Sequence, residues 1–407
     1  MKKIMILGAS ILQLPAIKKA KEMGLEVIAV DINPSAIGFS VKDVVREVIS
    51  TIDTSAILRA AEVHRIDGIM TLASDMPMQS VAAVCHKMGL AGISTETALM
   101  ATNKALMRDA LKNNGVPIPR YFRVKTKEEF FNAVKAVCTD RTRCIAKPVD
   151  NSGSRGVNLI VDDYALDAAY EYSRGFSRSG EVVVEEFMEG AEVSVETFAV
   201  NGNISVIQIT DKVTTGAPYF VEMAHSQPSQ LSADIKAKIV EVAIAANRAI
   251  GLLNGPSHTE IKITRNGPQI VEIGARLGGD FITTYLVPLS TGVDMVESNI
   301  RFALGEDVDI MPKYNRGAAI RFFDSGIGTV HEVKGIEEAE KTPGIVQVGI
   351  LCKVGEQIHK IKNSGDRIGF VIAQGVSAQE AVDRCEDAVQ KVKILLKGGS
   401  SYENFGL

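Results

Sequence analysis

The stretch Cys144-Ile-Ala-Lys-Pro-Val-Asp-Asn-Ser-Gly-Ser-Arg-Gly-Val157 joins a short apolar strand with one lysine to a loop of glycines, hydroxyls and an arginine. Glycine lets a backbone approach an anion closely, hydroxyls and amides donate hydrogen bonds, and Lys147 and Arg155 supply positive charge. A lysine in a buried strand needs an anion or a facing carboxylate, because an unpaired buried ammonium is costly. We therefore expect a phosphate-binding loop; the alternative is an exposed edge-strand lysine beside an ordinary turn.

Length and charge favour a multidomain protein that acts on small molecules. The 407 residues suffice for two or three domains. The 45 Lys and Arg residues against 49 Asp and Glu give a formal net charge of −4, which argues against a nucleic-acid or anionic-membrane binder. No apolar run approaches the roughly 18 residues that a membrane helix needs. We expect a cytoplasmic protein.

The cysteines and histidines suggest neither a zinc site nor a disulfide framework. The six histidines lack His-x-x-x-His spacing, so no zinc site is predicted. The cysteines are scattered along the chain, and we predict reduced, mostly buried thiols. The five are Cys85, Cys138, Cys144, Cys352 and Cys385.

Residues 1–98 alternate apolar runs with helical patterns, which is typical of a small doubly wound parallel sheet. The expected strands are 3–8, 26–30 and 68–72, and the expected helices are 13–23, 57–64 and 79–88. A linker-like segment follows, and then a helix over 103–115.

Residues 99–312 and 313–407 have an α+β pattern, so the predicted fold class is α/β plus α+β. Asn-Gly turns are expected at 201–202 and 266–267. The last helix begins at a Ser377/Glu380 capping box. Its apolar stripe is expected to pack on its own sheet; the alternative is a homodimer contact. The stripe consists of Val382, Cys385, Val389, Val392 and Leu396.

The segment from Ser257 to Asp280 is predicted to form a hairpin that brings two carboxylates together. With a three-residue loop of residues 265–267, Glu260 lies directly opposite Glu272. Opposed like charges destabilise a hairpin unless a cation lies between them, and carboxylate oxygens suit Mg²⁺ that carries phosphates. Arg276 could hold an anion beside that metal. The alternative is a solvated glutamate pair on a surface hairpin.

The stretch Glu181-Val-Val-Val-Glu-Glu-Phe-Met-Glu-Gly-Ala-Glu192 is a strand that ends in acidic and apolar residues. Its end can offer backbone groups and a hydrophobic wall to a planar base, and Glu192 can accept from ribose hydroxyls. The alternative is an edge strand that ends in solvated acids.

These segments, preceded by Asn103-Lys104, occur in an order that closely resembles the ATP-grasp superfamily of carboxylate–amine (or thiol) ligases, near the carbamoyl-phosphate synthase-like and L-amino acid ligase branches. The resemblance implies an ATP-grasp fold in three parts. Residues 1–98 resemble the pre-ATP domain, residues 99–312 the ATP-grasp domain with a lid subdomain at about 120–190, and residues 313–407 the biotin-carboxylase-like C-terminal domain.

The resemblance also implies roles for individual residues. Lys147 and Arg276 would be catalytic, and Glu260 and Glu272 would bind Mg²⁺, with Mn²⁺ as an alternative. Gly274 is a departure, because the family often has Asn two residues after the second metal glutamate. The expected ATP-binding residues are Lys104, Lys147, Ser152, Gly153, Ser154, Gly156, Glu185, Glu186, Phe187, Met188 and Glu192.

The implied activity is an ATP- and Mg²⁺-dependent ligation of a carboxylate, such as that of an amino acid, to an amine through an acyl phosphate, with release of ADP and phosphate. Purine-pathway, carbamoyl-phosphate and biotin-carboxylase types of ATP-grasp enzyme are alternatives. A NAD(P)-dependent oxidoreductase is a third class, based on Gly8 and Asp31, although residues 8–13 lack two glycines of the dinucleotide fingerprint.

For the ligase, the candidate substrate-binding residues are Glu222, His225, Gly278, Gly279 and Asp280.

Overall fold

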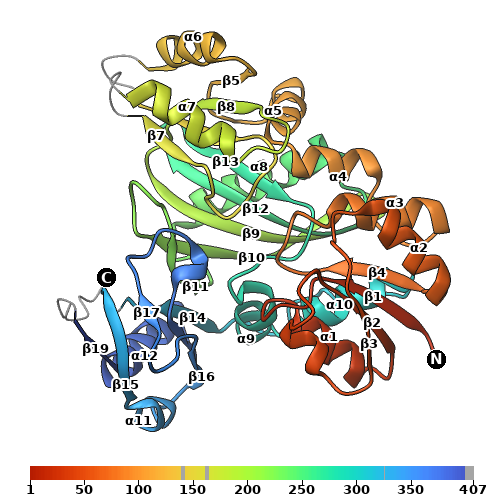
Figure 1. Ribbon diagram of the computed structural model, residues 1–407, viewed down its shortest axis with the longest axis vertical. Helices are drawn as coiled ribbons and strands as arrows, with labels where there is room; N and C mark the ends of the chain where they lie inside the picture. Colours follow the sequence, from red (N-terminus) through yellow and green to blue (C-terminus); the bar gives the residue numbers. More distant parts are fainter. Residues whose placement is uncertain (139–142, 161–164, 325, 399–407) are drawn as a thin grey trace.

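The computed structural model describes residues 1–138, 143–160, 165–324 and 326–398. It has an N-terminal α/β part, a central part with a small antiparallel subdomain at one end, and a C-terminal α+β part (Figure 1). This arrangement confirms the predicted fold class.

The N-terminal part is a parallel sheet in the order β3 (Val44–Glu47), β2 (Glu26–Val30), β1 (Lys3–Leu7), β4 (Gly68–Thr71). Strand β1 is buried on both faces, because Ile4 and Ile6 pack into one core while Met5 and Leu7 pack into another. The predicted strands and helices of this part are present, and β3 is an addition to them. The helices are α1 (Leu14–Glu22), η1 (Ile37–Ser40), α2 (Thr54–His64) and α3 (Met78–Met88).

The expected linker after this sheet is a helix. Helix α4 (Thr95–Thr102) begins at Ser94, whose side chain accepts from the Thr97 amide. Asn103 ends it and caps α5 (Lys104–Asn113), because the Asn103 side chain accepts from the amides of residues 105 and 106. The cap fixes Lys104 at the first position of α5.

The lid subdomain is an antiparallel sheet in the order β5 (Tyr121–Val124), β8 (Val182–Glu186), β6 (Cys144–Pro148), β7 (Asn158–Ile160). Helices α6 (Lys127–Val137) and α7 (Leu166–Gly175) pack on it. Phe130 of α6 meets Tyr170 of α7 in their shared core, with ring centroids 5.3 Å apart. This subdomain forms one end of the molecule (Figure 1).

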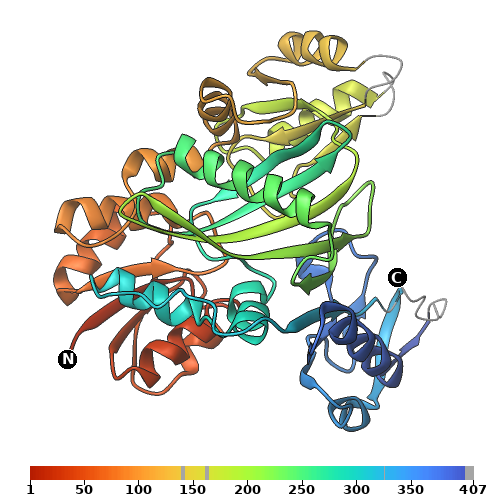
Figure 2. The ribbon, with the colours of Figure 1, turned by 180° about the vertical axis from the view of Figure 1, so that it is seen from behind.

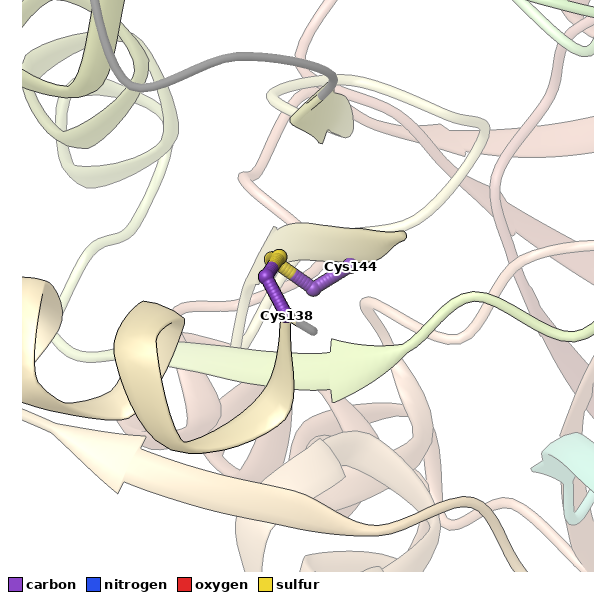
Figure 3. The surroundings of a disulfide bond; sticks show 2 residues. All are labelled: Cys138 and Cys144. Atoms are coloured by element: carbon purple, nitrogen blue, oxygen red, sulfur yellow. A yellow bond between two sulfur atoms is a disulfide. The ribbon is translucent and has the colours of Figure 1, made fainter. Parts of the chain in front are cut away.

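The prediction of five reduced cysteines is wrong for one pair. Cys138, at the end of α6, forms a disulfide with Cys144, the first residue of β6, and the two Cα atoms are 5.7 Å apart (Figure 3). Spacing alone does not show that a helix end and a strand start face each other. Cys85, Cys352 and Cys385 are free and buried, as expected.

A single eight-stranded sheet forms the centre of the molecule and continues into the C-terminal part. Strand β11 pairs with β14 in the register Ala224↔Arg321, so the sheet crosses the boundary expected near residue 313. The strand order is β13 (Gly267–Gly274), β12 (Gly255–Thr264), β9 (Ala191–Val200), β10 (Asn203–Thr214), β11 (Glu222–Gln227), β14 (Gly317–Phe322), β18 (Gly369–Gly375), β16 (Ile345–Ile350).

Helices that the sequence analysis did not predict complete the central part. Helix α8 (Ala233–Ala249) packs across β13, β12 and β10, on the side seen in Figure 2. The segment after the hairpin forms η3 (Ile282–Leu286), α9 (Val287–Thr291) and α10 (Met295–Ala303).

The β12–β13 hairpin brings Glu260 opposite Glu272 by a route that differs from the prediction. Thr264 pairs with Gly267, so the turn is the two residues 265–266 and not three. A bulge between Glu260 and Ile261 then shifts the register, and Glu260 pairs with Glu272. The expected opposition is therefore confirmed, although the expected turn is wrong.

The C-terminal part adds α11 (Ile336–Glu340), α12 (Ala378–Lys391) and a small sheet of β15 (Gly328–Lys334), β17 (Gln357–Ile358) and β19 (Lys393–Lys397). It also contains η4 (Ser364–Asp366), whose Ser364 side chain donates to Glu222 of β11. Helix α12 packs on β14 and β18 through Val382 and Cys385, which confirms that the stripe faces its own sheet. The helix ends before Val392, however, and Leu396 belongs to β19. Over the described residues, no helix is long and apolar enough to cross a membrane.

Candidate active site

A cleft of about 930 Å³, open to solvent, lies between the lid subdomain and the eight-stranded sheet. It gathers residues that lie far apart in the chain: the start of α5, the loop after β6, the end of β8, and the facing strands β9, β12 and β13. The predicted residues that line it are Lys104, Lys147, Ser152, Gly153, Ser154, Glu185, Glu186, Phe187, Met188, Glu192, Glu222, Glu260 and Glu272.

Lys147 has the facing carboxylate that its buried strand position requires. Its Nζ lies 2.9 Å from Glu185 Oε2, and Arg108 of α5 binds the same carboxylate through Nε at 2.7 Å and Nη2 at 3.1 Å. The Glu185 side chain is 1% exposed. Burial opposes ionisation, but the two cations prevail and lower the pKa of Glu185 to about 2. Sequence reasoning missed Arg108, since its partner lies 77 residues away.

Lys104 reaches the other side of the cleft. Its Nζ donates to Glu272 Oε1 at 2.7 Å and to the Asn151 carbonyl at 2.7 Å. It thereby joins the glycine-serine loop to the hairpin that carries the opposed carboxylates. The Lys104 amide also donates to the Val149 carbonyl, which holds the start of α5 against β6.

Lys212 of β10, which no sequence motif points to, lies among three glutamates. Its Nζ is 2.8 Å from Glu192, 3.0 Å from Glu260 and 3.5 Å from Glu222, and its side chain is only 2% exposed. These carboxylates raise the pKa of Lys212 well above its ordinary value despite burial, and Lys212 in turn lowers the pKa of Glu260. The β9–β10 register, which pairs Lys212 with Glu192, is the signal that could have identified it.

A second buried pair supports Glu260 from its own strand. His258 Nδ1 lies 2.5 Å from Glu196 Oε1, and His258 Nε2 lies 3.5 Å from Glu260. Burial lowers the pKa of His258, but Glu196 and Glu260 outweigh this effect and raise it to about 9. Below that pH the imidazolium partly neutralises the acidic hairpin.

Two aromatic rings form an apolar part of the cleft wall. Phe187 and Phe220 lie with ring centroids 5.7 Å apart, and the Arg143 guanidinium lies 4.9 Å from the Phe187 ring. Gly156 does not line the cleft. With φ of +77°, it lies where a Cβ would be 2.6 Å from Phe176 and Pro148, so it shapes the base of the loop.

Glu260 and Glu272 provide hard oxygen donors on adjacent strands, and both line the cleft with Glu192 and Glu222. This donor set suits Mg²⁺, which is held by one or two carboxylates together with substrate phosphates. Lysine ammonium groups contact both carboxylates here. Among the described residues, no group of three or more acids, histidines or cysteines is arranged as a complete metal cage.

Two family matches account for the central and C-terminal parts of the chain. Residues 140–284 match the family described as ATP-grasp domain, and residues 321–397 match L-amino acid ligase C-terminal domain 2. The chain belongs to the ATP-grasp family of ligases.

Individual relatives agree with this assignment. Alanine–anticapsin ligase of Bacillus subtilis (strain 168) is 32% identical over 246 residues, which cover 55% of this chain and 51% of that protein. L-arginine-specific L-amino acid ligase of Bacillus subtilis is 28% identical, covering 68% of this chain and 67% of that protein. The chain thus spans about half the length of the alanine–anticapsin ligases that it matches.

Solved ATP-grasp structures show the same fold along nearly the whole chain. The L-amino acid ligase of Bacillus licheniformis superposes with a TM-score of 0.83 at 22% identity, covering 98% of this chain and 99% of that one. Phosphoribosylglycinamide synthetase of Anaerococcus prevotii gives 0.79 at 23% identity, covering 97% and 100%.

In this ATP-grasp protein, the remaining predicted site residues lie outside the nucleotide cleft. Arg276 binds Asp75 of the N-terminal part, with Nε–Oδ1 at 2.8 Å and Nη2–Oδ2 at 3.0 Å. His225 was expected in a loop, but it is buried in β11, because residues 222–227 form a strand of the central sheet. Its Nε2 lies 3.4 Å from Asp280.

Asp280 is already paired with the C-terminal part. Arg367 binds both carboxylate oxygens at 2.7 Å, lies over the Phe322 ring at 3.8 Å, and donates to the Glu222 carbonyl. Burial raises the pKa of Asp280, but the Arg367 guanidinium and, less strongly, His225 outweigh it and lower that pKa. Gly278 and Gly279 allow close packing: a Cβ at 278 would lie 2.7 Å from His258, and one at 279 would lie 3.3 Å from Ala73.

The first βα turn, where a dinucleotide pyrophosphate would bind, is filled by a side chain. Gln13 is buried, accepts from Ser10 Oγ at 2.6 Å, and donates to the Leu72 carbonyl at 2.6 Å. Asp31 accepts from the Ala9 amide at 2.8 Å. This packing leaves the turn unsuited to a nicotinamide dinucleotide.

Proposed function

We propose that this protein activates the carboxylate of an amino acid with ATP and joins it to an amine, releasing ADP and phosphate. The main support for this proposal is the cleft, which brings Lys104, Lys147 and the glycine-serine loop close to the opposed Glu260 and Glu272. Two lysines, a loop of amides and hydroxyls, and a pair of hard carboxylates are what a magnesium nucleotide requires. The alanine–anticapsin and L-amino acid ligases support an amino acid as the substrate.

The residues have separable tasks in this reaction. Lys104 and Lys147 hold phosphate oxygens, while Phe187 and Met188 provide a wall for the base and Glu192 accepts from ribose hydroxyls. The Glu185 carboxylate is committed to Arg108 and Lys147, so its part in nucleotide binding is to orient Lys147. The loop of residues 152–156 excludes water from the activated carboxylate.

Glu260 and Glu272 would hold the magnesium ion, which neutralises charge on the nucleotide phosphates when bound. Gly274 offers no side-chain ligand, so these two carboxylates are the hairpin's contribution. Arg276 stabilises the anionic acyl phosphate. The amine then attacks the acyl carbon, phosphate leaves, and the amine proton passes to a base, for which Glu222, which lines the cleft, is the candidate.

The purine-pathway alternative has weaker support. The phosphoribosylglycinamide synthetase shares the fold at 23% identity, whereas the C-terminal residues 321–397 match the L-amino acid ligase domain. We therefore propose small-molecule carboxylates and amines as the substrates. A cytoplasmic location is a separate part of the proposal.

A phosphate-release screen of amino acids, singly and in pairs with ATP and Mg²⁺, tests the proposal. We expect release only with a suitable carboxylate, and complete loss in Lys147→Ala and Glu272→Ala. Lys334→Ala, a matched change at an exposed lysine of β15, should keep wild-type turnover. ATP with Mg²⁺ should raise the melting temperature, while NADH should not. Wild-type turnover in either cleft variant would refute the assignment.

A further inference from the structure

Arg276 is held by a carboxylate from a different part of the molecule. Asp75 lies between β4 and α3 of the N-terminal part, 201 residues before Arg276 in the chain. The two side chains form a bidentate pair at 2.8 and 3.0 Å, and each is 13% exposed. Paired acceptors fix the plane of a guanidinium as well as its position.

The loop that carries Asp75 is itself fastened to the same backbone position. The Ala73 amide and Arg276 Nη1 both donate to the Leu277 carbonyl, at 3.3 and 3.2 Å. Ala73 has φ of +59°, a conformation that costs about 1 kcal/mol or more for a residue with a Cβ and persists where its surroundings impose it. The loop is therefore held in one conformation against Arg276.

Gly274 makes room for this pair. A Cβ at position 274 would lie 2.7 Å from Asp75 Oδ1 and 3.0 Å from Arg276 Cζ, closer than side chains pack. The asparagine that related enzymes often carry at this position cannot coexist with the pair in its present geometry. Glycine at 274 and aspartate at 75 thus form a matched combination.

The pair leaves one edge of the guanidinium available. Asp75 uses the Nε/Nη2 edge, and one hydrogen of Nη1 goes to Leu277. One hydrogen on Nη1 and one on Nη2 are left to bind an anion. Because the guanidinium is already held in place, it does not have to reorganise when charge develops on the substrate.

We propose that Asp75 is a positioning residue for ligation, supplied by the N-terminal part to orient Arg276 toward the acyl phosphate, and that glycine at 274 is a requirement of this pair. The inference rests on the proposed function. It explains why position 274 is glycine, where the family resemblance implies asparagine: the glycine leaves room for the pair that places the arginine.

Kinetics of Asp75→Ala and Asp75→Asn test the positioning role. We expect kcat for amino-acid-dependent ADP release to fall about 10- to 100-fold, because misplacement of a transition-state contact costs rate. The rise in melting temperature caused by ATP with Mg²⁺ should persist, since Asp75 does not line the nucleotide cleft. Glu306→Gln, which removes the ion pair of Lys2 with the loop after α10, should keep kcat within about twofold. Wild-type kcat in Asp75→Ala would overturn the proposal.

A double-variant cycle separates the steric requirement from general damage. Gly274→Ala should lower both kcat and melting temperature, with kcat reduced about 10-fold or more. In the Asp75→Ala background the same change should cost less than about threefold, because the freed arginine can move aside. If Gly274→Ala lowered kcat by the same factor in the wild-type and Asp75→Ala backgrounds, the claim that Gly274 and Asp75 depend on each other would be wrong. If wild type releases no ADP with any amino acid, the proposed function and the positioning role both fail, while the melting-temperature cycle still tests the packing of residues 75 and 274.

Discussion

Replacement of Glu185 by glutamine tests the buried ion cluster that joins α5 to the lid subdomain. Arg108 on α5 and Lys147 on β6 share the Glu185 carboxylate of β8 at 2.7 to 3.1 Å. Glutamine keeps the size of the side chain but removes its charge. Two buried cations would then face a neutral amide, and the lid sheet would lose its charged attachment to α5.

The structure gives the size of the effect. The pKa of Glu185 is about 2, against 4.5 for an ordinary glutamate, and this difference corresponds to about 3 kcal/mol in favour of the folded state at neutral pH. Removal of one partner from a buried pair costs about 3–5 kcal/mol, which agrees. Because the pKa is lowered, the stabilisation is complete above pH 4.5 and is lost as the pH falls toward 2. Between pH 6 and 8 it should be constant.

Urea denaturation at several pH values, combined with hydrogen exchange of the β6 and β8 amides, measures this loss. Glu186→Gln is the matched control: it lies on the same strand, makes no ion pair with a described residue, and should change stability by less than about 0.5 kcal/mol. If Glu185→Gln proves as stable as Glu186→Gln, or if their difference varies between pH 6 and 8, the account of the cluster is wrong.

Three further results are expected. Gly156→Ala should weaken ATP binding and destabilise the lid more than Gly153→Ala. Both glycines have positive φ, but only at Gly156 would a Cβ collide with neighbouring atoms. Equal effects of the two changes on melting temperature and on ATP affinity would contradict this. Thiol titration in denaturant should find three thiols in protein purified without reductant and five after reduction, and five in both would exclude the Cys138–Cys144 disulfide. Ser377→Ala should lower stability by about 1 kcal/mol, measured by urea denaturation, since its hydroxyl accepts from the Glu380 amide; an unchanged midpoint would show that the cap contributes nothing.

The sequence predicted what depends on local pattern. Apolar runs located three strands of the N-terminal sheet and the lid strands β6 and β8, and the lysine-bearing strand with its glycine-serine loop located the cleft. Glu260 was placed opposite Glu272 even though the turn was misjudged, because a bulge in the hairpin offset an error of one residue. The prediction was right only because the unpredicted bulge cancelled the error in the length of the turn.

The rest depended on partners far apart in the chain. Lys212 and Glu260 are 48 residues apart, and Arg276 and Asp75 are 201 apart. No local period records such pairs, since they exist only after the strands and domains have assembled. The buried position of His225 was missed for the same reason, because β11 is a strand only through its pairing with β10 and β14.

The continuous central sheet limits how enzymes of this kind can exchange segments. A chimera that takes its last hundred residues from another ligase must bring a first strand able to continue the ladder from β11 at Ala224↔Arg321. A mismatch would leave β11 as a bare edge, and unpaired strand edges recruit other chains into aggregates. We therefore expect a grafted C-terminal part to fail unless its first strand and the β11 residues that pair with it are transplanted together.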